Sequence, residues 1–194
     1  SIIGAQNLIN FGIKNKVRAL ENGTQGWTLS GYKLEHNKTR SLDLDEIKSQ
    51  KIKYHKSASE IIKNFNLKKI NLKKLNSFLQ DKTKNTFVFN VTANKNFLDN
   101  KIDFKNAPGG QLIQSTDSFI GVLNCKVVLI DDGDLLRSAL TASWLKQMGY
   151  DVYIFEDDPN YLKNFFDQKK KFLIPKAKAV GNSNLKKFLK LNLL

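Results

Sequence analysis

The sequence predicts an α/β domain built on a parallel β-sheet that helices cover. Three short apolar segments rich in β-branched and aromatic residues carry this prediction, at 86–91, 126–130 and 151–155. A stretch with apolar residues at helical spacing lies between the last two. A strand, a helix and a strand joined by short connections form a crossover unit, which requires parallel strands with helices packed on the sheet.

The helix of this crossover unit has clear start and stop signals. The acidic turn Asp131–Asp134 ends the second strand and supplies helix-capping side chains. Apolar residues then recur at helical spacing, at Leu135, Leu136, Ala139, Leu140, Leu145 and Met148. Gly149 follows at the position where a left-handed residue closes a helix. Upstream, residues 72–79 predict a further amphipathic helix, and 106–110 predict a turn around Pro-Gly-Gly.

The first 36 residues repeat the second half of that unit. A helix is predicted over 1–11 with Gly12 at its stop position, then a strand at 16–20 and a turn at 22–27. The strand that should precede this helix is missing, and a lone helix and strand bury too little apolar surface to offset the entropy of ordering them. We therefore expect the chain to begin inside a domain. The alternative is that this segment packs on the later domain as an added layer.

These patterns divide the chain into four parts. Residues 1–36 are expected to be the C-terminal part of a truncated domain, and 37–69 a polar, lysine-rich linker with a short helix at 59–65. Residues 70–160 form the complete domain, and 161–194 a basic tail. The tail holds nine lysines with Asp167 as its only acidic residue, so it is a candidate for contact with a partner or a membrane surface.

Composition narrows the classes of function. A hydrophobic content of 41% excludes a wholly disordered chain, and no apolar run reaches the roughly 20 residues that a transmembrane helix needs. The net charge of +14 is almost all lysine, since Arg18, Arg40 and Arg137 are the only arginines. Nucleic-acid readers favour arginine and stacking aromatics, so the composition argues against a nucleic-acid partner. A lysine-rich, polyanion-binding protein remains an alternative.

The single cysteine limits both disulfide and metal chemistry. Cys125 cannot form an intramolecular disulfide, and with His36 and His55 it gives no zinc-ligand spacing. Because it precedes the strand at 126–130, we predict that it is a small buried residue. We expect no metal, no cofactor and a reducing, cytoplasmic compartment.

Two regions together resemble the rhodanese-like (sulfurtransferase) family. Residues 22–31, Asn-Gly-Thr-Gln-Gly-Trp-Thr-Leu-Ser-Gly, are similar to the end of one rhodanese domain. Residues 107–112, followed by 127–138, are similar to the core of another. Their order and spacing resemble proteins with several such domains in tandem. The resemblance covers about 1–36 and 70–160, and it implies a parallel sheet flanked by helices, preceded by the C-terminal half of a second such domain.

The resemblance also implies where an active site would lie. In active members a cysteine ends the central strand, and an Arg-Ser or similar pair closes the loop that follows. Backbone N–H groups of that loop lower the thiol pKa and hold the bound sulfur as a persulfide. Matching that pair with Arg137-Ser138 places Asp132 at the cysteine position. The active-site-like loop then consists of Asp132, Gly133, Asp134, Leu135, Leu136, Arg137 and Ser138.

A carboxylate cannot carry sulfane sulfur, so we expect the domain at 70–160 to be catalytically silent, with no catalytic residue in this chain. The cysteine of the truncated domain would precede Ser1. The parent protein would then move sulfane sulfur from thiosulfate or a persulfide to a thiol acceptor, with the silent domain as an intramolecular partner. Whether the chain itself is an enzyme stays open.

Other interpretations of the same residues remain. A non-catalytic module would keep the cradle around Gly133–Arg137 to bind an anion or a peptide. In a receiver-like domain Asp131–Asp134 would bind magnesium, but such a domain needs several more strand–helix units downstream. Trp144 is predicted to be a core or interface residue, and Asn90 to anchor the neighbouring loop.

Overall fold

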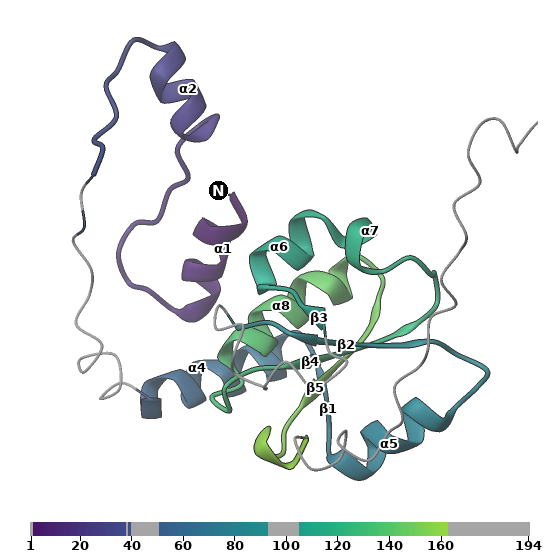
Figure 1. Cartoon of the computed structure of the whole chain (residues 1–194). Coiled ribbons are helices and arrows are strands. Elements are labelled where there is room, and N and C mark those ends of the chain that lie inside the picture. The colour runs from purple at the N-terminus through teal and green to yellow at the C-terminus, as the bar shows by residue number, and fades with distance from the viewer. Residues whose placement is uncertain (1, 38, 40–50, 93–104, 163–194) are drawn as a thin grey trace, which may run out of the picture.

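The computed structural model describes residues 2–37, 39, 51–92 and 105–162, and its centre is a five-stranded parallel sheet (Figure 1). The strand order is β1-β5-β4-β2-β3. The strands are β1 (Lys68–Ile70), β2 (Thr86–Asn90), β3 (Lys105–Asn106), β4 (Lys126–Ile130) and β5 (Asp151–Phe155). All pairs are parallel, with Leu129 beside Phe89 on one side and Ile154 on the other. The predicted strands at 86–91, 126–130 and 151–155, and the α/β class, are confirmed.

Helices cover both faces of the sheet, as a sheet of buried parallel strands requires (Figure 1). On one face lie α4 (Lys51–Asn64), α6 (Gly109–Gln114), α7 (Thr116–Phe119) and α8 (Leu136–Gln147). Their apolar side chains pack with those of the strands, and Phe89, Leu129 and Ile154 are fully buried there. The other face is covered by α5 (Leu72–Gln80), whose buried residues are Leu75 and Phe78.

The two central helices follow the sequence prediction closely. Helix α8 ends before Gly149, whose φ of +90° is the left-handed conformation predicted there. Helix α5 begins after Asn71, whose side chain accepts the N–H of Lys74 at 2.9 Å. The predicted turn at 106–110 is shorter than expected, because α6 already begins at Gly109.

The predicted linker at 37–69 is wrong over its second half. Residues 51–64 form α4, and Lys68–Ile70 form β1, which pairs with β5. Ala58 and Ile61 are each 1% exposed in the main core. The polar, lysine-rich composition of this segment belongs to the solvent side of an amphipathic helix, so it concealed a narrow apolar stripe.

The N-terminal segment differs from the prediction after its first helix. Helix α1 (Ile2–Phe11) is confirmed, but residues 16–20 form no strand, and the predicted turn at 22–27 contains α2 (Gly23–Leu29). A strand needs a neighbour for its backbone hydrogen bonds, and residues 16–20 have none in the described part of the chain. Asn22 and Gly23 both have positive φ, which lets the chain turn sharply into α2.

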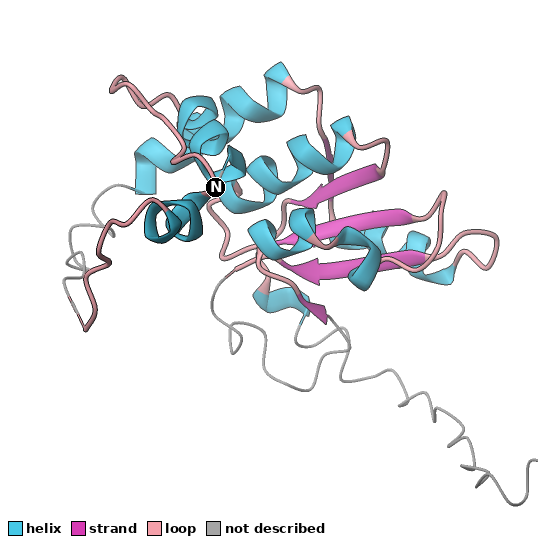
Figure 2. Ribbon diagram, turned by 90° about the horizontal axis from the view of Figure 1, so that it is seen from above, coloured by secondary structure: helices cyan, strands magenta, loops and turns pink. Residues whose placement is uncertain are grey.

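Helix α1 packs against the sheet domain, with the N-terminal helices to one side of the strands (Figure 2). The Trp144 indole donates to Asn7 Oδ1 at 2.8 Å, and the Ser57 hydroxyl donates to the Phe11 carbonyl at 3.3 Å. Trp144 is therefore an interface residue, as predicted. By contrast, α1 and α2 have no buried residue. The added-layer alternative thus accounts for one face of α1 only.

None of the described helices combines the length and the apolar character needed to cross a membrane. The basic tail lies outside the described residues from 163 onward, so its predicted helices remain predictions.

Candidate functional site

The candidate site is the loop that joins β4 to α8. It lies at the carboxyl end of the central strand, the edge where α/β proteins place their ligands. All of Asp132, Gly133, Asp134, Leu135, Leu136, Arg137 and Ser138 lie in this loop or in the first turn of α8, as the sequence predicted.

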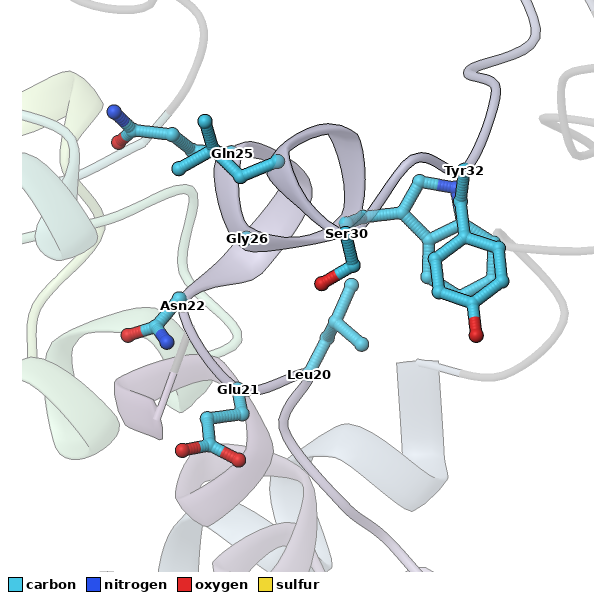
Figure 3. Close-up of a pocket in the computed structure, with 9 residues that line it drawn as sticks. Leu20, Glu21, Asn22, Gln25, Gly26, Ser30 and Tyr32 are labelled. Atoms are coloured by element: carbon cyan, nitrogen blue, oxygen red, sulfur yellow. The ribbon is translucent and has the colours of Figure 1, made fainter.

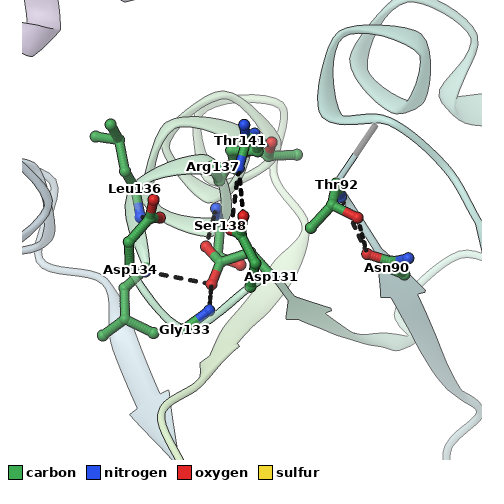
Figure 4. A network of polar contacts seen from close by, with 11 residues as sticks. Asn90, Thr92, Asp131, Gly133, Asp134, Leu136, Arg137, Ser138 and Thr141 are labelled. Atoms are coloured by element: carbon green, nitrogen blue, oxygen red, sulfur yellow. Dashed lines mark hydrogen bonds and ion pairs between the residues drawn. The ribbon is translucent and has the colours of Figure 1, made fainter. Parts of the chain in front are cut away.

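The most important residue of this loop is Asp131, which the sequence analysis did not select. Its side chain is only 2% exposed, and its carboxylate points back into the loop (Figure 4). The N–H groups of Gly133 and Leu135 donate to Oδ1 at 3.1 and 3.2 Å, and the N–H of Ser138 donates to Oδ2 at 2.9 Å. Backbone N–H groups in such a loop are those that would bind an anion. Here the protein's own carboxylate occupies them.

Two residues give the loop the backbone shape that this carboxylate needs. Gly133 has φ +95° and Leu135 has φ +59°, so both are left-handed. For leucine this conformation costs roughly 1–2 kcal/mol. The hydrogen bonds to Asp131 offset that cost, because they form only when both N–H groups turn inward.

Burial sets the electrostatics of Asp131. It raises the pKa of the carboxyl above 3.8, and the charge of Asp134 raises it further. The N–H groups of Ser138 and Gly133 oppose that shift. The Ser138 hydroxyl also lowers the pKa from its position beside the carboxylate, although it makes no well-aligned hydrogen bond with any residue that the structure describes.

This raised pKa predicts a pH dependence of stability. The folded protein holds the Asp131 proton more tightly than the unfolded chain, so this group's contribution to stability is complete below pH 3.8 and is lost as the pH rises through the folded pKa. We expect Asp131→Asn to remove that part of the slope. Urea unfolding of both proteins at a series of pH values from 3.5 to 7 measures it, and equal slopes in the two would contradict the assignment.

Asp132, at the position that the resemblance gives to the cysteine, points away from the N–H cradle. Both of its carboxylate oxygens lie 3.0 Å from Nη1 of Arg137, and both side chains are about half exposed. An exposed pair of this kind contributes about 0–1 kcal/mol. Asp134 instead accepts the N–H of Leu136 at 2.9 Å, next to the start of α8.

Three carboxylates, those of Asp131, Asp132 and Asp134, lie within 4.8 Å of one another. Each already has a partner: backbone N–H groups, Arg137 and the Leu136 N–H respectively. The receiver-like alternative also loses support from the topology. Two strands of the sheet precede β4 along the chain in addition to β3, and within the described residues only β5 follows it.

Asn90 anchors the loop beside the site, as predicted. It is 1% exposed at the end of β2, where its amide donates to Asn106 Oδ1 at 2.8 Å. Its Oδ1 accepts the backbone N–H and the hydroxyl of Thr92 at 3.0 and 2.8 Å. Sequence alone did not identify Thr92 or Asn106, because their role depends on the pairing of β2 with β3.

Cys125 lies at the opposite end of β4 from this loop. It is buried, and burial raises its pKa, which disfavours the reactive thiolate. The prediction of a structural role is confirmed for its burial.

Comparison with known proteins gives one informative match. No protein-family model and no curated protein match the sequence. The crystal structure of a thiosulfate sulfurtransferase from Pseudomonas aeruginosa matches with a TM-score of 0.74 and 30% sequence identity. The match covers 98% of this chain and 36% of that chain, so the chain spans little more than a third of its neighbour's length.

Proposed function

We propose, from the premise that the chain belongs to the rhodanese-like family, that it is a segment of a multidomain sulfurtransferase in which the loop 132–138 is catalytically silent. The identity of 30% over almost the whole chain to a thiosulfate sulfurtransferase carries this proposal. Sulfur transfer from thiosulfate or a persulfide to a thiol acceptor is then the activity of the parent protein.

The proposed transfer takes place on a cysteine outside this chain. Its thiolate attacks the outer sulfur of thiosulfate, the sulfur–sulfur bond breaks, and sulfite leaves with the bonding electrons. The resulting persulfide gives its outer sulfur to the acceptor, which restores the thiolate. The domain described here would support or position the active one, and with α4 and β1 it starts near residue 51 rather than 70.

Two features support the silence of the loop. Asp132 provides no nucleophile that can carry sulfur. Asp131 fills the three N–H groups that would otherwise hold a persulfide or an oxyanion. With two carboxylates at one loop, electrostatic repulsion would also disfavour an anion such as thiosulfate.

The alternative function is a non-catalytic binding or regulatory module. The half-exposed Arg137 guanidinium favours it, since it is a cation at the mouth of the loop. An anion bound there would have to replace Asp132 as the partner of Arg137 and would find the N–H cradle occupied. For this reason we rank it second, and loss of ligand binding in Arg137→Ala would be its signature.

A thiosulfate:cyanide sulfurtransferase assay tests the proposal. We expect no turnover above the uncatalysed rate from the chain 1–194, and turnover from the longer natural polypeptide that contains it. Cys125→Ser is the matched control and should change neither result. Turnover by 1–194 that Cys125→Ser abolishes would overturn the silent-loop assignment, and inactivity of both proteins would favour the binding module.

A further inference from the structure

Helix α1 repeats the C-terminal end of α8 residue by residue. Both helices stop at a glycine with φ +90°, Gly12 and Gly149. The Gly12 N–H bonds the Ile9 carbonyl at 2.9 Å, and the N–H of the next residue bonds the Leu8 carbonyl at 3.3 Å. Around Gly149 the corresponding bonds reach Lys146 and Leu145, both at 3.0 Å. Residues 2–12 therefore align with 139–149 without a gap.

The repeat continues beyond the glycine. Residues 17–21 are Val-Arg-Ala-Leu-Glu, and 152–156 are Val-Tyr-Ile-Phe-Glu. The connection after Gly12 is two residues longer than the one after Gly149. The second copy contains most of β5, a strand inside the sheet, whereas the first copy has no strand neighbour among the described residues.

The face of α1 that corresponds to the sheet-packed face of α8 is uncovered. In α8 that face is made by Ala139, Ala142 and Leu145, all 0% exposed. At the positions equivalent to Ala139 and Leu145, Ile2 is 77% and Leu8 45% exposed.

The strand-like segment after α1 is uncovered as well. Leu20 is 51% exposed, while its equivalent, Phe155, is 2% exposed. Leu20 also borders an open hollow of about 640 Å³, together with Trp27 and Leu29 (Figure 3). Apolar side chains gathered around an open hollow indicate a surface that another element covers.

The opposite faces of the two helices meet each other. Trp144 of α8 donates to Asn7 of α1 at 2.8 Å, and these two residues occupy equivalent positions in the alignment. Contact through equivalent positions is the mark of an approximate two-fold relation. Such a relation leaves the outer face of α1 directed at its own sheet, as the inner face of α8 is directed at β4 and β5.

We infer that residues 2–21 are the helix and strand of a second α/β unit, whose parallel sheet packs on Ile2, Ala5 and Leu8 and takes residues 17–21 as one strand. The sheet belongs to the same polypeptide, in a region outside residues 1–194. A single chain in the neighbour contains a match to 98% of this chain within 36% of its own length, so more chain is present there. A second copy of the described domain does not fit, because helices cover both faces of its sheet.

This inference goes beyond sulfur transfer and holds whatever the activity of the parent, so its test uses no assay of turnover. Hydrogen exchange is compared between the chain 1–194 and the longer natural polypeptide. We expect the amides of Ala19 and Leu20 to exchange at least about 100-fold more slowly in the longer protein, because ladder hydrogen bonds protect them there. Equal rates would overturn the inference. Protection that depends on protein concentration would assign the sheet to a separate polypeptide and overturn it as well.

A substitution gives an independent readout. Leu8→Lys should leave the melting temperature of 1–194 unchanged, since the side chain is already half exposed, and lower that of the longer protein. Leu123→Lys, at an 82% exposed position, is the matched control and should be silent in both. A Leu8→Lys variant with no effect in the longer protein would contradict the packed face. If that variant does not fold there, the exchange measurement on the unmodified protein still decides.

Discussion

Replacing Asp131 with alanine is expected to lower the free energy of unfolding by about 3 kcal/mol. Each buried backbone donor that loses its acceptor costs about 1–3 kcal/mol, and three such donors converge on this carboxylate. Release of the carboxylate from its buried position returns part of the cost. The left-handed Leu135 would also lose the hydrogen bond that holds it. Urea unfolding at pH 7 measures the difference.

The neighbouring acid supplies the control for this experiment. Asp132→Ala removes one carboxylate from the same loop but only an exposed ion pair, so a loss of at most about 1 kcal/mol is expected. Asp131→Asn should fall between the two, because the amide keeps an oxygen acceptor. Similar losses from Asp131→Ala and Asp132→Ala would mean that the N–H cradle is not held by Asp131.

Gly109→Ala is expected to destabilise the protein by about 1–3 kcal/mol, the usual cost of overpacking. A methyl group at Gly109 would collide with the Thr141 hydroxyl of α8. That hydroxyl also donates to the Arg137 carbonyl at 2.8 Å, so the start of α6 is fitted against the first turns of the helix that follows the loop. Thermal unfolding of the variant measures the cost.

A double variant and a neighbouring glycine make this test specific. Gly109→Ala combined with Thr141→Ala should recover most of the lost stability, because the remaining Cβ contact of 3.4 Å is ordinary packing. Gly110→Ala should be tolerated, since nothing lies within 4 Å of its added methyl group. Additive losses in the double variant would show that Thr141 is not the obstacle.

The sequence by itself determined the central part of this protein. Strands β2, β4 and β5 and helices α5 and α8 are encoded locally, by short β-branched runs and by apolar residues at helical spacing with a glycine stop. The position of the loop 132–138 followed from the end of β4. The rhodanese-like resemblance came from short motifs in a fixed order, and the structural match supports it.

Only the tertiary structure decided the roles that depend on neighbours. Residues 51–64 have a polar composition, and their narrow apolar stripe has meaning only against the sheet. Residues 16–20 have the composition of a strand, but a strand forms only where another strand accepts its hydrogen bonds. Asp131 and Asp132 are adjacent and chemically identical. The left-handed turns at Gly133 and Leu135 bring N–H groups to the first, while Arg137 binds the second at the surface.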